Sequence, residues 1–147
     1  MTEIVVRIGT VDEAVTVLAG INELSSGVDA TTIRARFAHQ PALILVAEYQ
    51  QQLIGVKIGY ALSDHVFYSW LGGVLASGRG LGIAQKLLEV QEAWVVAQSQ
   101  YTMINVKSRN CFPAMLRLLF RNGYVIENME KKGKLRDYRL CFTKTIN

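Results

Sequence analysis

The sequence predicts a single domain with a mixed α/β (α+β) fold, in which helices flank a central sheet. Two observations predict it. Apolar residues recur at helical spacing in some segments and gather in β-branched runs in others. These segments follow one another in the order β-α-α-β-β-β-α-β-α-β-β. Half of the 147 residues are hydrophobic, which is enough for one core, so we expect one domain over residues 1–147.

The first forty residues predict one strand and two helices. Residues 4–8 form a short apolar run typical of a strand. Thr10 and Glu13 then have the spacing of a capping box, which begins a helix. Asp29 is placed to cap a second, short helix, which Pro41 would end.

Three strands follow. Residues 42–49 and 52–62 are β-branched runs separated by a pair of glutamines, which predicts a hairpin. Residues 66–75 predict a third strand that is interrupted by Gly72 and Gly73. Paired glycines weaken a strand, so we expect a bulge or a close approach of another backbone there.

The second half of the chain predicts two further helices among three strands. Residues 82–98 give the clearest helix, since Ile83 and Leu87 begin an apolar stripe along one face. The remaining elements are a strand over 101–107, a helix over 112–122 ended by Gly123, and strands over 124–129 and 136–144 around a Lys-Gly turn.

The charge is unevenly distributed. The chain carries a net +4, but residues 1–73 hold four basic and seven acidic side chains, and residues 74–147 hold twelve and five. A basic half suits an anionic partner. The basic run over 131–139 has no recognition-helix pattern and no aromatic RNA-binding signature. We therefore expect a solvated basic edge there, or contact with a phosphate-bearing cofactor; nucleic acid is the least favoured partner.

The cysteines and the apolar runs exclude several classes of protein. Cys111 and Cys141 lack CxxC or Cys/His spacing, so we expect two reduced cysteines and no metal site. No apolar run approaches the roughly 20 residues that span a bilayer. The N-terminal segment has no basic and then apolar signal pattern. We expect a cytoplasmic protein without membrane contact.

Residues 79–84 carry the clearest chemical signal. This glycine-rich turn leads from a strand into a helix, and Gly80 and Gly82 allow positive φ and close approach of a ligand. The free N–H groups of the following helix start suit a phosphate. A tight turn with glycines for packing is the alternative. A Walker A loop is excluded because Ile83 and Ala84 follow the last glycine, and a Rossmann fingerprint would come early in the chain.

The same segment resembles motif A of the GNAT superfamily of N-acetyltransferases, Q/R-x-x-G-x-G/A. Arg79, Gly82 and Ala84 occupy its three defined positions, and "RGLGIAQKLL" continues into the family's helix. Upstream, "LILVAEYQQQLIGVKIGYAL" looks like the family's hairpin, and downstream "KSRNCFPAMLRLLFRNGYVI" looks like its later strand–helix region. The resemblance covers residues 40–145 in order.

The resemblance implies a single GNAT-like domain that uses acetyl-CoA as cosubstrate and no metal. Its sheet would be mixed and mostly antiparallel and flanked by four helices. A bulge at the paired glycines would splay strand 66–75 from strand 101–107. The pantetheine arm would contact the backbone of Val74 and Leu75. Asn110 would contact the cofactor arm, or cap the next helix. The pyrophosphate would bind the backbone N–H groups of Arg79, Gly80, Leu81, Gly82, Ile83 and Ala84.

The catalytic groups are less defined. Many family members place a tyrosine four residues before the glycine that ends the later helix, where it protonates the leaving thiolate; here that residue is Leu119. Ser108, Cys111 or water could substitute. Some members use a glutamate as base on the strand that here is 66–75, and this strand has none. Tyr68 lies near that place, as base, polar stabiliser or packing residue. Asp64 and His65 lie just before the strand, where His65 is either a base candidate or simply solvated, and Glu48 is expected to be a charge at the hairpin edge.

We therefore expect an N-acetyltransferase that moves an acetyl group to a primary amine by direct transfer in a ternary complex. The amine could belong to a small molecule or a protein, and the acidic first half favours a cationic, polyamine-like acceptor. Leu119 keeps open the alternative of a non-catalytic acyl-CoA-binding regulatory module. A homodimer is common in the resembling family and is possible here.

Overall fold

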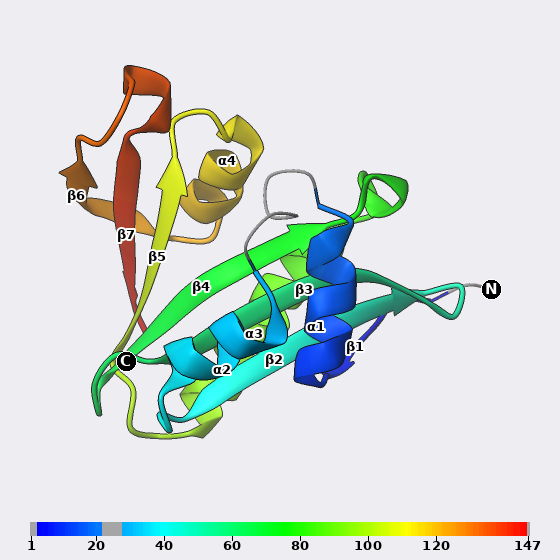
Figure 1. The fold of residues 1–147 in the computed structure, drawn as a ribbon. Coiled ribbons are helices and arrows are strands. Elements are labelled where there is room, and N and C mark those ends of the chain that lie inside the picture. Colours follow the sequence, from blue (N-terminus) through cyan, green and yellow to red (C-terminus); the bar gives the residue numbers. More distant parts are fainter. Residues whose placement is uncertain (1–2, 22–27, 147) are drawn as a thin grey trace.

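The computed structural model describes residues 3–21 and 28–146, and its helices and strands follow the predicted order (Figure 1). Within these residues, seven strands form one sheet in the order β1-β2-β3-β4-β5-β7-β6, and only β4 and β5 run parallel. The mixed, mostly antiparallel sheet is thereby confirmed. The strands are Val5–Ile8 (β1), Ala42–Tyr49 (β2), Gln52–Ala61 (β3), Val66–Val74 (β4), Met103–Arg109 (β5), Val125–Glu130 (β6) and Arg139–Thr145 (β7); the helices are Val11–Ala19 (α1), Ala30–Phe37 (α2), Ile83–Ala97 (α3) and Pro113–Arg121 (α4).

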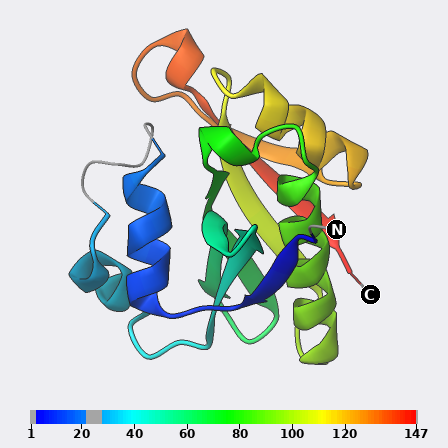
Figure 2. The same ribbon diagram turned by 90° about the vertical axis from the view of Figure 1, so that its right-hand side faces the viewer.

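The sheet separates two layers of helices. Helices α1 and α2 cover one face, and α3 and α4 cover the other (Figure 2). Each face has its own core, with Leu18 and Ile33 on the α1–α2 side and Phe67, Leu88 and Phe142 on the α3–α4 side. Burial of these apolar side chains is the main stabilising contribution. No helix in the described ranges is long and apolar enough to cross a membrane.

Helices α1 and α2 begin at the capping residues that the sequence predicted. The Thr10 hydroxyl accepts from the Glu13 N–H at 3.1 Å, and the Glu13 carboxylate accepts from the Thr10 N–H at 3.0 Å, so the capping box is confirmed. The Asp29 carboxylate caps α2 as predicted. Pro41 does not end α2, because the chain leaves the helix earlier, at Ala38, which has a left-handed φ of 48°.

The bulge of β4 lies at Trp70 and not at the paired glycines. Gly72 and Gly73 pair with β3 in regular register, Gly72 opposite Lys57, and the register slips where Trp70 has no partner residue. Of the two glycines, Gly73 is required by a close neighbour. A Cβ on Gly73 would lie 2.6 Å from Cδ1 of Ile21, which packs onto β4 from the end of α1. The prediction of a bulge was right for the strand and wrong for the residue.

The last hairpin has a longer connection than the sequence predicted. Strand β7 begins at Arg139, three residues later than expected. The chain turns at Gly133, where φ is 71°, and then forms a short 3₁₀ turn over Leu135–Asp137. At the other end of β6, Gly123 has a φ of 86° and ends the preceding helix as predicted.

Candidate active site

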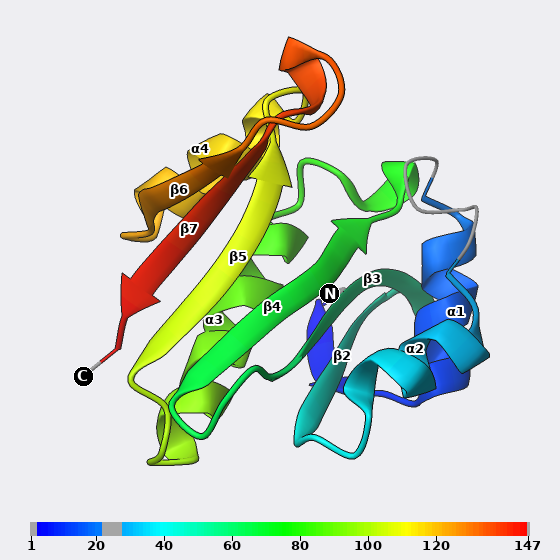
Figure 3. The ribbon, with the colours of Figure 1, turned by 60° about the vertical axis from the view of Figure 1, so that its left-hand side comes forward.

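Strands β4 and β5 form an opening through the sheet. They pair over four residues each, ending at Ser69 and Val106. Beyond these residues β4 continues to Val74 and β5 to Arg109, but the two strands no longer pair with each other and diverge (Figure 3). The predicted splay is therefore present. It leads into a cavity of about 1120 Å³.

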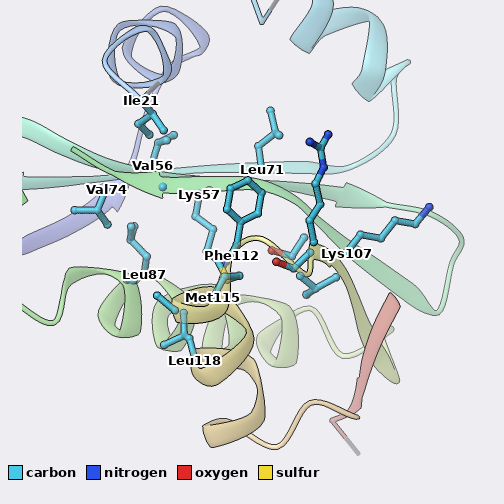
Figure 4. Close-up of a pocket in the computed structure, with 18 of the residues that line it drawn as sticks. Ile21, Val56, Lys57, Leu71, Val74, Leu87, Lys107, Phe112, Met115 and Leu118 are labelled. Carbon is cyan, nitrogen blue, oxygen red and sulfur yellow. The ribbon is translucent and has the colours of Figure 1, made fainter. Parts of the chain in front are cut away.

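The cavity reaches both faces of the sheet. Figure 4 shows Ile21 and Leu71 on one side of the strands and Lys57, Met115 and Leu118 on the other. The first two belong to the core under α1 and α2, whereas Met115 and Leu118 belong to the core under α3 and α4. Two ligands could therefore approach from opposite faces and meet between β4 and β5.

One end of the cavity is formed by the glycine-rich turn before α3. Gly80 and Gly82 have φ values of 82° and 77°, and a Cβ built at either would meet nothing within 4 Å. The glycines are thus required by the backbone conformation, and the space above them is open. In the described part of the chain, no hydrogen-bond acceptor is paired with the backbone N–H groups from Gly80 to Gln85. The N–H of Arg79, which was predicted to bind phosphate with them, donates instead to the carbonyl of Ala76 at 3.3 Å. These free donors at a helix start, with its partial positive charge, fit a phosphate group.

The edge of β4 offers further backbone groups beside the turn. The N–H of Leu75 donates to the carbonyl of Ile54 on β3 at 2.8 Å. Alternate residues of a strand direct their backbone groups to opposite edges, so Val74 directs its own toward the opening. Of the two residues predicted to contact an extended ligand, Val74 has the suitable orientation, and the amide of Leu75 is already used.

Comparisons with known proteins agree with this geometry. No protein-family model and no curated protein matches the sequence, but many solved structures match the fold. A chain of the NatC complex, solved with Gag peptide and CoA, is 16% identical with a TM-score of 0.80, and 99% of each chain is covered. Aminoglycoside 6′-acetyltransferase type Ii is 14% identical with a TM-score of 0.78 over 97% of each chain. A GNAT family acetyltransferase from Elizabethkingia anophelis, solved with acetyl-CoA bound, is 14% identical with a TM-score of 0.68 over 97% of each chain.

The chain has the GNAT fold. Most of the site residues predicted from the GNAT resemblance line the cavity, namely Tyr68, Val74, Arg79, Gly80, Gly82, Ile83 and Ala84. Leu75, Leu81 and Asn110 are not among its lining residues. The side-chain amide of Asn110 donates to the carbonyl of Leu135 at 2.9 Å and so joins the start of α4 to the β6–β7 connection. Asn110 does not cap α4, whose N-cap is Phe112.

Tyr68 lies beside the apex of the splay. It pairs with Asn105, one position before β4 and β5 separate. Its side chain is 9% exposed, and burial raises the pKa of its phenol. Within the described residues its hydroxyl has no hydrogen-bond partner. A neutral phenol at this place can hydrogen-bond a ligand, whereas its raised pKa makes it a poor base near neutral pH.

Leu119, at the position where GNAT enzymes often have a tyrosine, directs its side chain into the core. Leu119 is 1% exposed, packs under α3 and α4 and does not line the cavity. Its neighbour Leu118 lines the cavity instead, as do Ser108 and Cys111. Both candidate substitutes for the general acid therefore line the cavity, and the geometry does not distinguish one from the other.

The remaining candidates from the sequence lie elsewhere. Neither Asp64, His65 nor Glu48 lines the cavity. His65 is exposed, with Nδ1 3.3 Å from the carbonyl oxygen of Gln100. The Glu48 carboxylate accepts from Arg7 at 3.3 Å on the outer part of the sheet. Of the three, His65 was expected to be solvated and Glu48 to be a charge at the hairpin edge, and Asp64 was a candidate near the base position that does not line the cavity.

Lys57 is a cavity residue that the sequence analysis missed. It stands on β3, is 7% exposed and has no ion pair or hydrogen bond within the described residues. Burial lowers the pKa of its ammonium to about 8. Opposite it, Gly72 leaves room: a Cβ there would lie 3.7 Å from Lys57 Nζ. A single lysine within the otherwise apolar run of residues 53–62 was the signal for it, since lysine is rarely buried without a partner.

The described lining of the cavity is strongly basic, whereas the acidic first half of the sequence favoured a cationic acceptor. Its only acidic residue in the described chain is Asp137, and its eight basic residues are Arg36, Lys57, Arg79, Lys107, Arg109, Arg121, Arg136 and Arg139. Six of these come from the basic half of the sequence and converge on one site. The described residues contain no group of three or more His, Cys, Asp or Glu side chains that could hold a metal ion.

Proposed function

We propose that this chain is an N-acetyltransferase that transfers an acetyl group from acetyl-CoA to a primary amine directly, in a ternary complex. The observation that carries the proposal is the set of unpaired N–H groups from Gly80 to Gln85, next to a splay that opens the sheet to both faces. The GNAT fold supports it, because acetyl-CoA or CoA is bound in solved structures with this fold.

Different parts of the cavity would bind different parts of the two reactants. The N–H groups of Gly80 to Gln85 would bind the pyrophosphate, and Val74 would hold the pantetheine arm in the opening. When bound, acetyl-CoA would supply an acetyl group activated as a thioester. The α1–α2 side would admit the amine. Holding the two reactants in contact is itself a large contribution to rate, worth several kcal/mol.

Tyr68 would act by hydrogen bonding. Its hydroxyl has no hydrogen-bond partner among the described residues, and its raised pKa keeps it protonated near neutral pH. It would therefore orient the amine or stabilise the oxyanion that forms on the attacked carbonyl, and it would not be the base. Ser108 and Cys111 line the α4 end of the same cavity as candidate proton donors.

Cofactor binding is tested by a matched pair of tryptophan substitutions on α3. Ala84 lies in the first turn beside the free N–H groups, whereas Ala93 is exposed further along the helix. Calorimetry with acetyl-CoA should show binding by the wild type and by Ala93→Trp, and none by Ala84→Trp. Thermal unfolding checks that both variants fold. Absence of binding by the wild type would refute the proposal.

Turnover is a separate measurement. Release of free CoA, followed with a thiol reagent across a broad panel of primary amines, should distinguish an enzyme from a binding module. The burial of Leu119 in place of a tyrosine is the observation that favours the module. Binding of acetyl-CoA with no CoA release from any amine would support the module and contradict the transferase.

A further inference from the structure

Arg36 is an exposed residue at the α1–α2 side of the cavity, and two neighbouring side chains contact its guanidinium. Its guanidinium lies over the Trp70 ring, with Cζ 4.5 Å from the ring centroid. Its Nη1 donates to the Tyr60 hydroxyl at 3.2 Å. Tyr60 in turn packs edge-on against Trp70, with centroids 6.1 Å apart. Stacking and one hydrogen bond therefore orient the guanidinium, and most of its N–H donors stay available.

The bulge in β4 creates this arrangement. Trp70 is the residue without a partner on β3, and a bulge redirects the side chain at which it occurs. Both Trp70 and the next residue, Leu71, pack with the core on the α1–α2 side. The strand thus presents an indole ring to α2 at the place where it separates from β5, and Arg36 stacks on that ring.

No acid in the described residues neutralises Arg36. No carboxylate lies within 4.0 Å of it, whereas Lys107 and Arg139 contact Glu130 at 3.1 and 4.0 Å. The cofactor phosphates do not account for Arg36 either. Their proposed site is the start of α3, and α3 and α2 lie on opposite faces of the sheet (Figure 2).

Tyr60 connects Arg36 to the apex of the splay. Tyr60 accepts the hydrogen bond from Arg36, and its ring packs edge-on against the ring of Tyr68 with centroids 5.6 Å apart. One aromatic ring therefore separates the guanidinium from the residue placed beside the reacting groups. A small molecule could contact both at once.

We propose that Arg36 binds an oxyanion of the acceptor, so that the acceptors are small amines with a carboxylate or a phosphate a short spacer from the nitrogen. This inference rests on the proposed transferase function and names its acceptor class. An arginine fork held by neighbouring groups suits both oxyanions, because it can donate two parallel hydrogen bonds.

Matched pairs of amines test the inference with acetyl-CoA as donor. Phenylalanine is compared with phenethylamine for the carboxylate, and phosphoethanolamine with ethanolamine for the phosphate. The anionic member of at least one pair should have the lower KM, by about tenfold or more, the effect expected of one charge-assisted hydrogen bond. Which pair shows the effect identifies the oxyanion.

Substitutions assign the effect to the side chain. Arg36→Gln should abolish the difference within the pair by raising only the KM of the anionic amine, and Arg36→Lys should restore part of it. Arg34→Gln is the control, since Arg34 is exposed on the same helix and does not line the cavity. A merely structural role for Arg36 would raise KM, or lower kcat, equally for both members.

The remaining outcomes distinguish failure of this inference from failure of the transferase function. Equal use of the two members of both pairs, or preference for a polyamine such as spermidine, would overturn the inference while the transferase function stands. If no amine releases CoA, the transferase function fails instead. Calorimetry of the CoA-loaded protein with N-acetylphenylalanine and N-acetylphenethylamine then tests the oxyanion site alone. Tighter binding of the anion, lost in Arg36→Gln, supports the site, and equal binding overturns it.

Discussion

Replacing Lys57 by methionine should stabilise the protein near neutral pH. Lys57 is buried without an ion-pair partner in the described chain, and burial lowers the pKa of its ammonium from 10.5 to about 8. Methionine keeps an unbranched apolar chain of similar length in the same space and removes the charge. The substitution therefore removes the cost of burying an ammonium group and retains the packing of its stem.

The size of the effect follows from the change in pKa. One pKa unit corresponds to about 1.4 kcal/mol, so a fall from 10.5 to about 8 corresponds to roughly 3 kcal/mol at pH 7. Between pH 8 and 10.5 the unfolded chain binds the lysine proton and the folded chain has released it. The unfolded state then binds more protons, so the stability of the wild type rises with pH. The difference in unfolding free energy between Lys57→Met and the wild type therefore falls to about 1 kcal/mol at pH 10.

Urea unfolding at pH 7 and pH 10 measures both quantities. The exposed Lys131 gives a control, since Lys131→Met removes the same charge from a surface turn. The difference in unfolding free energy between Lys57→Met and the wild type should be large at pH 7 and small at pH 10, whereas Lys131→Met should stay close to the wild type at both. Equal stability of Lys57→Met and the wild type at pH 7, or a gap independent of pH, would refute the reasoning.

Three further substitutions have defined outcomes. Tyr68→Phe should lower kcat, on the order of 10²-fold, with little change in the KM for acetyl-CoA; unchanged kcat in steady-state assays would remove Tyr68 from the mechanism. Thr10→Ala should cost about 1 kcal/mol because the capping box of α1 is lost, read from the midpoint of urea unfolding. Tyr124→Phe should lower the free energy of unfolding by about 1 kcal/mol in the same measurement, since it removes the 2.8 Å hydrogen bond from the Tyr124 hydroxyl to the Glu92 carboxylate. An unchanged midpoint would contradict either stability prediction.

The features that the sequence predicted well are held by local interactions. The capping box needs only Thr10 and Glu13, three residues apart, and the hydrogen bonds that define it join those two residues. The turn at Gly80 and Gly82 is likewise set by two backbone conformations that glycine adopts readily. Such signals can be read from the chain because their causes lie within one turn of it.

The features that it missed depend on contacts between distant segments. Whether a bulge falls at Trp70 or at Gly72 is decided by the register against β3, and Ile21 fills the space over Gly73. In the same way, the side of α4 that faces the cavity depends on how the helix packs, and this places Leu118 at the cavity and Leu119 in the core. Spacing along the chain determines neither the place of the bulge nor the side of α4 that faces the cavity.

The charge of the acceptor site shows the same dependence most clearly. Counted by halves of the sequence, the first half is acidic, which favoured a cationic acceptor. However, the fold brings Arg36 and Lys57 from that half to the cavity, and none of the acids of that half that the structure describes lines it. The local field at a site is set by the few charges that line it, and distant charges are screened by solvent. With the free N–H groups of α3 suited to phosphate and Arg36 on the opposite face of the sheet, we propose that the cavity holds two anions that belong to two different reactants.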